Sequence, residues 1–294
     1  MDSLKKLISP QYPRLVNRVK KIIERSEKDF SPDLSESKES FLWEHTVLVS
    51  SLAKRICSME GEDPFLVVVA ALFHDVGKFY GGEYHKEETP EEHLSSRIAK
   101  DILSKEGMEE EKIKKITSSL EALYNENKSK NRIADVVHDS DFLAKTGFTG
   151  AAQFFIKTTL RKQPMIKSLV QSSSKEMTYA SVLPRNMRTK AGKKMAYKNR
   201  KNTLSFFKGL FQELEDRGII RFVIKEVFLP SPKDPQKSIK VMIVLPQTCP
   251  ECQGAIGVNY SSKKGIKCTK LIANMKCRKC SQKYKTSFCL PEVS

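Results

Sequence analysis

Histidine and aspartate stand side by side at His74 and Asp75, directly after the apolar stretch Pro64–Phe73. A neutral imidazole and a carboxylate at one point are ligands that a hard or borderline divalent metal ion accepts. An isolated His-Asp pair more often only caps a buried helix. Two further candidate ligands accompany this pair, because His45 lies on a separate predicted helix upstream and Asp141 lies in an aspartate-containing segment downstream. These residues are the first candidates for chemistry.

The order of these residues, H…HD…D, resembles the HD superfamily of metal-dependent phosphohydrolases over roughly the first two thirds of the chain. The pentad HDVGK is the most specific part of the resemblance. The segment Arg185–Leu210 adds to it, because it is similar to the last helix of small bacterial and archaeal HD hydrolases that act on nucleotides. The resemblance implies a helical bundle that holds one divalent ion, Mn²⁺, Co²⁺, Ni²⁺, Fe²⁺ or Mg²⁺, through His45, His74, Asp75 and Asp141. Imidazole with carboxylate tolerates all these ions, so the sequence does not choose among them.

Further ligands are suggested by the same resemblance. Asp139 competes with Asp141 for the fourth ligand position. The family places its ligand just before an apolar pair, here Phe142-Leu143, which favours Asp141. His93 is a possible extra ligand, and His85 is a weaker candidate of the same kind.

Asp75 and Lys78 are the predicted catalytic residues. The ion would lower the pKa of a bound water and polarise a phosphoryl oxygen, while Lys78 would neutralise phosphate charge as a compact cation. The alternative is that Lys78 is an ordinary solvated lysine. Small nucleotidases of the family often carry Glu at this position. Two other departures are Ala144, where a second acid is common, and Ser118–Asn127, which lacks the further His of binuclear members and so favours a mononuclear site.

Hydrophobic periodicity predicts a mainly α protein. Apolar residues from Trp43 to Ile56 recur at near-helical spacing, so His45 projects from a helix with a buried face. The valine-rich stretch Pro64–Phe73 is compatible with a helix or a buried strand, and the resemblance favours the helix. Further helices are predicted at residues 12–25, 90–103, 109–124, 132–145, 151–160 and 187–216. Gly218–Leu229 and Ser238–Leu245, on either side of a turn-rich segment, predict a β-hairpin.

Six of the seven cysteines fall near the carboxyl end of the chain. Two C-x-x-C pairs are separated by a spacer of 24 residues that is long enough for the strands of a zinc ribbon, and they comprise Cys249, Cys252, Cys277 and Cys280. Four protein thiolates leave no open position on the metal, so this zinc is expected to be structural. The spacing favours a metal over a disulfide framework. Cys268 and Cys289 are expected in the core, although either could replace a cysteine of the pairs.

The formal net charge of +17 is unevenly placed. Residues 157–208 contain fourteen Lys or Arg against the single acid Glu176, and residues 247–294 contain nine against two. Regional basic charge indicates a surface that meets phosphates or nucleic acid. The alternative is a lysine-rich composition in which every solvated helix face is basic. Aromatic stacking on a nucleic acid could involve Tyr260, Tyr284 or Phe288.

The predicted organisation is a helical HD domain at 1–216, a β-hairpin linker at 217–246 and a zinc ribbon at 247–294. No run reaches the length of a membrane span, and the start of the chain lacks a secretory h-region, so we expect a cytoplasmic protein without a membrane partner. The first hypothesis is a phosphohydrolase that acts on a nucleotide or related phosphate compound. The alternative is a nucleic-acid-binding protein, or a nuclease, that uses the ribbon and the basic helix to bind RNA or DNA.

Overall fold

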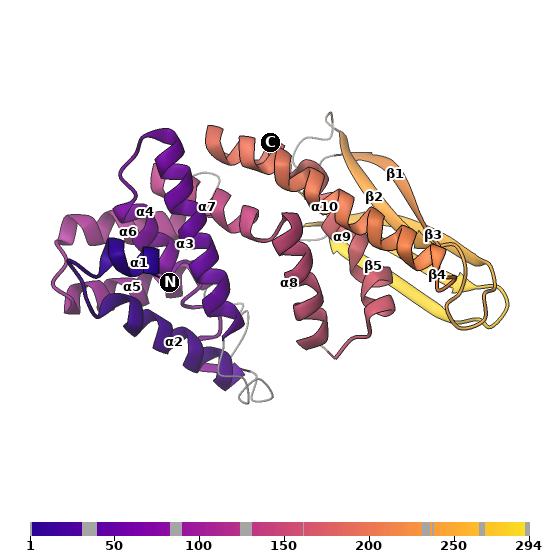
Figure 1. The fold of residues 1–294 in the computed structure, drawn as a ribbon, viewed down its shortest axis with the longest axis horizontal. Coiled ribbons are helices and arrows are strands. Elements are labelled where there is room, and N and C mark those ends of the chain that lie inside the picture. Colours follow the sequence, from indigo (N-terminus) through magenta and orange to yellow (C-terminus); the bar gives the residue numbers. More distant parts are fainter. Residues whose placement is uncertain are drawn as a thin grey trace. The chain divides into compact units, whose positions relative to one another are not determined.

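The computed structural model describes residues 2–30, 40–82, 90–123, 131–160, 162–230, 236, 238–264 and 268–291. The described part is mainly helical, with two small antiparallel sheets near its carboxyl end (Figure 1), and this confirms the predicted fold class. None of the described helices is long and apolar enough to cross a membrane. The elements in chain order are α1 (Asp2–Ile8), α2 (Leu15–Phe30), α3 (Phe41–Glu60), α4 (Phe65–Phe73), the 3₁₀ turn η2 (Tyr80–Gly82), α5 (Glu91–Lys105), α6 (Glu110–Ala122), α7 (Arg132–Ala144), α8 (Gly147–Leu160), α9 (Met165–Asn186), α10 (Lys190–Asp216), β1 (Phe222–Pro230), β2 (Ser238–Pro246), β3 (Ile256–Lys264), β4 (Thr269–Cys277) and β5 (Lys283–Cys289).

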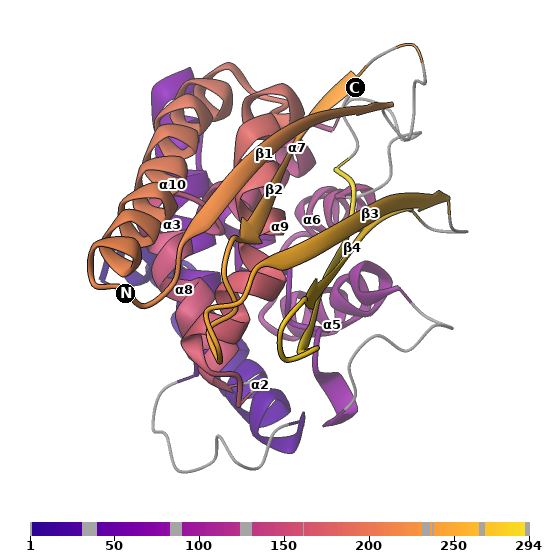
Figure 2. The same cartoon turned by 90° about the vertical axis from the view of Figure 1, so that its right-hand side faces the viewer.

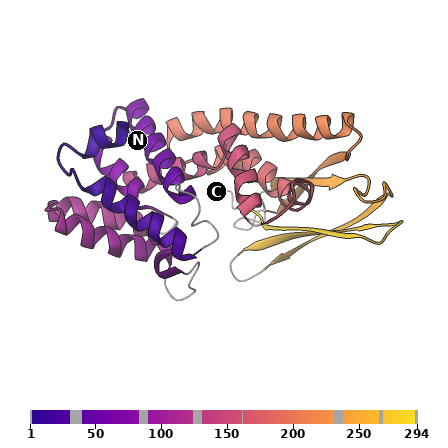
Figure 3. The same ribbon diagram turned by 60° about the horizontal axis from the view of Figure 1, so that its bottom comes forward.

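Two compact units make up the chain. The first comprises Met1–Ala144 with Arg188–Gly192, and the second comprises Lys145–Met187 with Lys193–Ser294. The first unit therefore takes in the residues just before and at the start of α10, and the rest of this long helix, drawn in orange in Figure 3, belongs to the second unit. The three-part division at residues 216 and 246 stays a prediction.

The short helix α4 lies at the centre of the first unit. All of its residues are apolar, and Val67 to Phe73 are buried. A helix that is apolar all round must be covered on every side, and α3, α6 and α7 pack around this one. The stretch Pro64–Phe73, for which the sequence pattern allowed either a helix or a strand, therefore forms the helix α4. Ser40 caps the start of α3, because its Oγ accepts a hydrogen bond from the backbone N–H of Trp43 at 3.0 Å.

The turn after α4 is fixed against α5. The N–H of Gly77 donates to Ser95 Oγ at 3.0 Å, and that hydroxyl donates to the carbonyl oxygen of His74 at 3.1 Å. A Cβ at Gly77 would stand only 2.9 Å from the backbone nitrogen of Ser95, so no other residue fits this close approach without displacing α5. The segment that carries His74 and Asp75 is held rigidly by these contacts.

Helix α9 organises the second unit, and the sequence predicted neither it nor α1. The helix lies beside β2 (Figure 2). Its residues Ser174, Thr178 and Ser181 present hydroxyls to the edge of β2 that does not pair with β1. The N–H groups of Val244 and Met242 donate to Ser174 Oγ and Thr178 Oγ1 at 2.9 and 3.0 Å. These side-chain bonds satisfy the strand edge in place of a third strand.

Replacement of Thr178 by Val should expose the cost of this arrangement. The variant keeps the side-chain volume but leaves the buried N–H of Met242 without its acceptor, so we expect opening of this region to become easier by about 1–3 kcal/mol. Hydrogen exchange at the Met242 amide measures the change. Thr117→Val is the matched control, because Thr117 bonds only carbonyls of its own helix, α6. Equal exchange at Met242 in the Thr178 variant and the unaltered protein would contradict this role.

Candidate metal centres

His74 has one ring nitrogen with no hydrogen-bond partner among the described residues. Its Nδ1 lies 2.7 Å from the carbonyl oxygen of Ala71, which can only accept, so Nδ1 carries the proton and donates. The lone pair is therefore on Nε2. That atom is buried and has no hydrogen-bond partner, and the residue is only 4% exposed. A buried nitrogen with a free lone pair, oriented by a bond from the other nitrogen to a backbone carbonyl, has the form of a metal-binding histidine.

His45 from α3 and Asp141 from α7 meet His74 in the interior of the first unit. His45 Nε2 lies 3.0 Å from Asp141 Oδ1, and His74 Nε2 lies 3.9 Å from the same oxygen. One ligand atom from each of the three residues lies within 4.8 Å of the others, and all three residues are buried. The arrangement suits a single divalent ion, because an ion at this point would satisfy the orphan nitrogen of His74.

Asp75 borders this group and is also paired with Lys78. Asp75 Oδ2 lies 3.6 Å from His74 Nε2, 3.8 Å from His45 Nε2 and 2.9 Å from Lys78 Nζ. Burial alone would raise the pKa of the Asp75 carboxyl, but the positive charge of Lys78 holds this pKa well below its usual range. Burial would lower the pKa of Lys78, but the Asp75 charge outweighs it and raises that pKa. Both groups are thus ionised at neutral pH.

The environment also keeps His45 in its metal-binding form. Burial is the largest influence on its pKa and lowers it, against the hydrogen bond and the charge of Asp141, which raise it. A neutral imidazole can offer a lone pair to a metal, whereas an imidazolium cannot.

Asp139 is placed differently from Asp141. Its carboxylate accepts hydrogen bonds from the backbone N–H groups of Arg188 and Thr189, at 2.9 and 2.8 Å to the nearer oxygen, and from Thr189 Oγ1 at 2.8 Å. A Cβ on Gly192 would collide with Asp139 Oδ2, so the glycine permits the approach. Asp139 therefore anchors the segment before α10 and the start of that helix, and sequence reasoning missed this role.

His93, the possible extra ligand, does not join the group. His93 lies in the first turn of α5 with an exposed side chain, outside the cluster of three. His85 lies outside the described residues. Among the described residues, three of the four predicted ligands, His45, His74 and Asp141, form the group, and the mononuclear character of the site stays a prediction.

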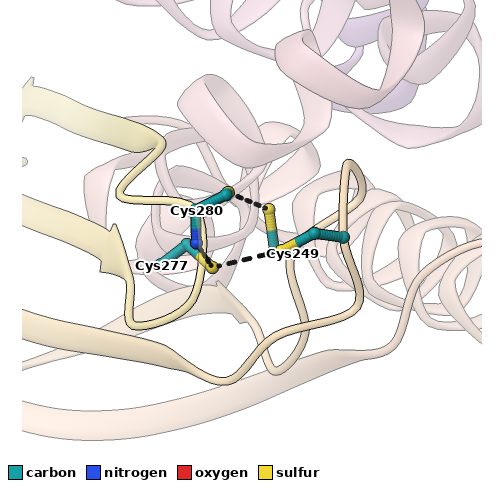
Figure 4. A group of neighbouring side chains, drawn as sticks. Cys249, Cys277 and Cys280 are labelled. Carbon is teal, nitrogen blue, oxygen red and sulfur yellow. Dashed lines mark hydrogen bonds between the residues drawn. The ribbon is translucent and has the colours of Figure 1, made fainter.

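A second candidate centre lies in the second unit, where the two C-x-x-C pairs converge. The sulfurs of Cys249 and Cys280 are 3.6 Å apart, and those of Cys252 and Cys277 are 3.5 Å apart (Figure 4). A tetrahedral zinc ion with Zn–S bonds of about 2.3 Å has sulfur–sulfur edges of about 3.8 Å. The four sulfurs all lie within 4.8 Å of one another, so they fit such an ion.

Backbone groups around Cys277 favour its thiolate. The N–H groups of Cys280 and Lys279 donate to Cys277 Sγ at 3.5 and 3.4 Å, and they lower the pKa of this thiol to about 6. The Tyr284 hydroxyl lies 3.4 Å from Cys249 Sγ. A Cβ on Gly254 would stand 3.0 Å from Cys277 Sγ and 2.7 Å from Lys279 Cβ, so only glycine fits beside the sulfurs. The sequence had suggested stacking or core roles for Tyr284, not a contact with a ligand sulfur.

Cys268 and Cys289 form a disulfide, whereas the sequence analysis expected both in the core, with either able to replace a ligand cysteine. Strand register explains the difference. Cys289 pairs with Lys270 across β5 and β4, and Cys268 precedes β4, so their Cα atoms lie 5.8 Å apart. This separation is within the range that a disulfide spans. Periodicity could not give this register.

Known proteins resemble this chain mainly in its first part. Residues 42–145 match the family model of the HD domain. YpgQ of Bacillus subtilis superposes with a TM-score of 0.51 at 19% identity, over 70% of this chain and 96% of YpgQ. A predicted HD superfamily hydrolase from an uncultured Thermotogales bacterium gives 0.47 at 17% identity over 67% and 91% of the two chains. A YpgQ complex with ADP gives 0.48 at 18% identity over 68% and 96%. At these identities the likeness shows the fold alone. The comparison with curated proteins found no match.

Asp141→Asn and Asp139→Asn should separate metal binding from folding. We expect Asp141→Asn to weaken Mn²⁺ or Co²⁺ binding by at least about a hundredfold, because a carboxylate ligand is lost. Asp139→Asn should keep the metal stoichiometry but lower the free energy of unfolding by about 1–3 kcal/mol, because acceptors of buried N–H groups are weakened. Calorimetric titration and urea unfolding measure the two effects. Equal metal affinities in the two variants would refute the assignment.

Cys277→Ser should remove zinc from the second centre. We expect one zinc per chain in the unaltered protein and in Cys57→Ser, a control in which a lone buried cysteine of α3 is changed. Elemental analysis after exhaustive dialysis measures the content. Retention of zinc in Cys277→Ser would show that the ion is held elsewhere.

Proposed function

We propose that this chain, which carries an HD domain at residues 42–145, is a metal-dependent hydrolase that cleaves a phosphoester or phosphoanhydride bond of a nucleotide or related compound. One observation carries the proposal. The buried Nε2 of His74 has no partner and lies 3.9 Å from Asp141 Oδ1, beside His45. A polar atom in such a position is costly to bury unless a ligand satisfies it, and a divalent ion is the ligand that these donor types suit.

His45, His74, Asp75 and Asp141 would hold this ion. When bound, it supplies a Lewis acid that polarises a phosphoryl oxygen and lowers the pKa of water. The imidazoles contribute neutral donors, and the carboxylates offset the charge of the ion. The carboxylate of Asp75 has a second task, because it also binds Lys78 at 2.9 Å. Asp75 would thus fix Lys78 at the border of the metal site.

Lys78 would act through charge and not through proton transfer. Its raised pKa keeps the ammonium protonated at neutral pH, so it is a poor general acid or base. Its side chain retains 20% exposure, which leaves it accessible to a phosphate. An ammonium that meets phosphate oxygens beside the metal would stabilise the charge that develops during cleavage.

A nucleotide is the proposed substrate because of the basic segment Arg185–Leu210. The described contacts bring Arg188 into the first unit, where its guanidinium lies 3.6 Å from Asp135 on α7, the helix that carries Asp141. A basic group beside the helix of the site favours a phosphate-bearing substrate. Nucleic-acid binding, the alternative from the sequence, would be a property of the second unit and would not require this metal site.

The activity test compares the full chain with Asp75→Asn and Lys78→Gln in Mn²⁺. Nucleoside mono-, di- and triphosphates are offered, ADP among them, and phosphate release is measured. We expect Asp75→Asn to lower kcat/KM by at least about a hundredfold, since both the ion and Lys78 lose their partner. Lys78→Gln should mainly raise KM, and Lys78→Arg should restore part of the loss because it keeps the charge.

Asp101→Asn is the matched control, because Asp101 is an exposed aspartate on α5 that pairs only with Lys105 in the described part of the chain. It should leave activity unchanged. Chelation should abolish activity in all active forms. Hydrolysis that is equal in the unaltered protein and Asp75→Asn would exclude this site as the source.

A further inference from the structure

The three-stranded sheet β3-β4-β5 has one face that nothing described in the second unit covers. Its other face is buried along β4 and part of β5, because Leu271, Ala273 and Met275 of β4 belong to the hydrophobic core together with Phe288 of β5. Side chains alternate between the two faces of a strand. The remaining residues of each strand therefore form an outer face, and their register across the sheet can be stated residue by residue.

The strand pairing orders the outer face into four rows. From one end of the sheet to the other, the rows are Lys263-Lys270-Cys289, Ser261-Ile272-Ser287, Asn259-Asn274-Lys285 and Gly257-Lys276-Lys283. All five lysines have exposed side chains and form no ion pair with a described residue. Arg278 adds a sixth cation at one end, because its Nε lies 3.8 Å from the position of a Cβ on Gly257. The sequence from Cys252 to Pro291 contains no acid.

Two pairs of lysines on this face lie directly opposite each other. Lys263 pairs with Lys270, and Lys276 pairs with Lys283. Opposite residues of antiparallel strands have Cβ atoms about 5 Å apart, and like charges in such pairs destabilise the sheet. Neither the hairpin nor the cysteine cluster requires this arrangement. An unfavourable charge distribution on a folded surface is typical of a site that becomes favourable when a ligand of opposite charge binds.

The extent of the face selects the kind of anion. Lys270 and Lys276 are six residues apart on β4, which corresponds to about 20 Å, and the lysines of β3 and β5 flank them. A single phosphate could contact only one or two of these groups. A chain of phosphates could contact them together. The amide and hydroxyl side chains between the lysines can also donate to phosphate and sugar oxygens.

The composition of the face disfavours a membrane and a protein partner. A membrane-binding surface combines cations with exposed large apolar side chains, whereas the one apolar side chain of these rows, Ile272, is half-buried. Tyr260 is exposed but pairs with Ala273, so it belongs to the opposite face. Lysine is depleted at protein interfaces, whereas nucleic-acid interfaces are strongly positive.

We propose that the outer face of the β3-β4-β5 sheet binds the phosphate backbone of a nucleic acid without regard to its sequence. The inference goes beyond the proposed function and does not depend on it, because the face contains no residue of the metal site at His74. It also replaces stacking on Tyr284 and Phe288 as the expected mode of binding, since neither side chain lies on this face.

The test uses the full zinc-loaded chain and fluorescent 20-nucleotide oligouridylate, with duplex DNA of the same length as a second probe. The triple variant Lys270→Gln, Lys276→Gln and Lys283→Gln removes three cations and both like-charge pairs. We expect its affinity at moderate salt to fall at least about tenfold, and the slope of log affinity against log salt to fall by about two to three. Its melting temperature should be unchanged or higher, because repulsion is relieved.

A matched triple variant, Lys21→Gln, Lys100→Gln and Lys114→Gln, has the same net charge. These lysines are exposed on helices of the first unit and form no ion pair with a described residue. It should bind as the unaltered protein does, and so should Asp75→Asn. Binding through net charge alone would weaken both triple variants equally and would overturn the proposal. Unchanged binding by the sheet variant would also overturn it, as would preference for anionic phospholipid vesicles or polyglutamate over both nucleic acids.

Discussion

Burial of two carboxylates beside two imidazoles is the constraint on which the first unit depends. Asp75 and Asp141 are almost inaccessible to water, and an isolated charge in such surroundings is too costly to keep. Lys78 balances one of the two charges. The other lies against His45, while the lone pair of His74 is left unsatisfied. The site therefore has more hydrogen-bond acceptors than donors. A divalent cation would satisfy the surplus acceptors, whereas apolar side chains could not.

The surrounding structure holds the unsatisfied His74 nitrogen and the carboxylates in place, so they cannot turn to other partners. The bond from His74 Nδ1 to the carbonyl of Ala71 fixes the ring, and the Gly77–Ser95 contact fixes the turn that follows. Asp139 is satisfied by the amides before and at the start of α10, so it does not compete for the site. Side chains held in this way lose little entropy when a ligand arrives, which is the benefit of a preorganised site. The site is therefore both rigid and short of one hydrogen-bond partner.

The sequence indicated the candidate metal-binding residues but not the residues that form ordinary hydrogen bonds and strand pairings. Histidine, aspartate and cysteine spacing indicated both candidate centres, whereas the apolar α4 was assigned as a helix only through the family resemblance, because its composition fits a buried strand equally well. Helix α9 was not predicted, and its hydroxyl residues bond the edge of β2, a contact that its own sequence pattern does not indicate. Strand register was equally inaccessible. It joins Cys268 to Cys289 and gathers lysines on one face of a sheet, and neither follows from local pattern.

The central claim is that His45, His74, Asp75 and Asp141 hold one divalent ion. Anomalous diffraction from crystals grown with Mn²⁺, recorded at the manganese edge, tests it most directly. The account predicts one manganese peak in the first unit, at about 2.2 Å from both Nε2 atoms and from a carboxylate oxygen of Asp141. A structure of the Mn²⁺-treated protein without a peak between these side chains, or with the ion bound by other residues, would contradict it.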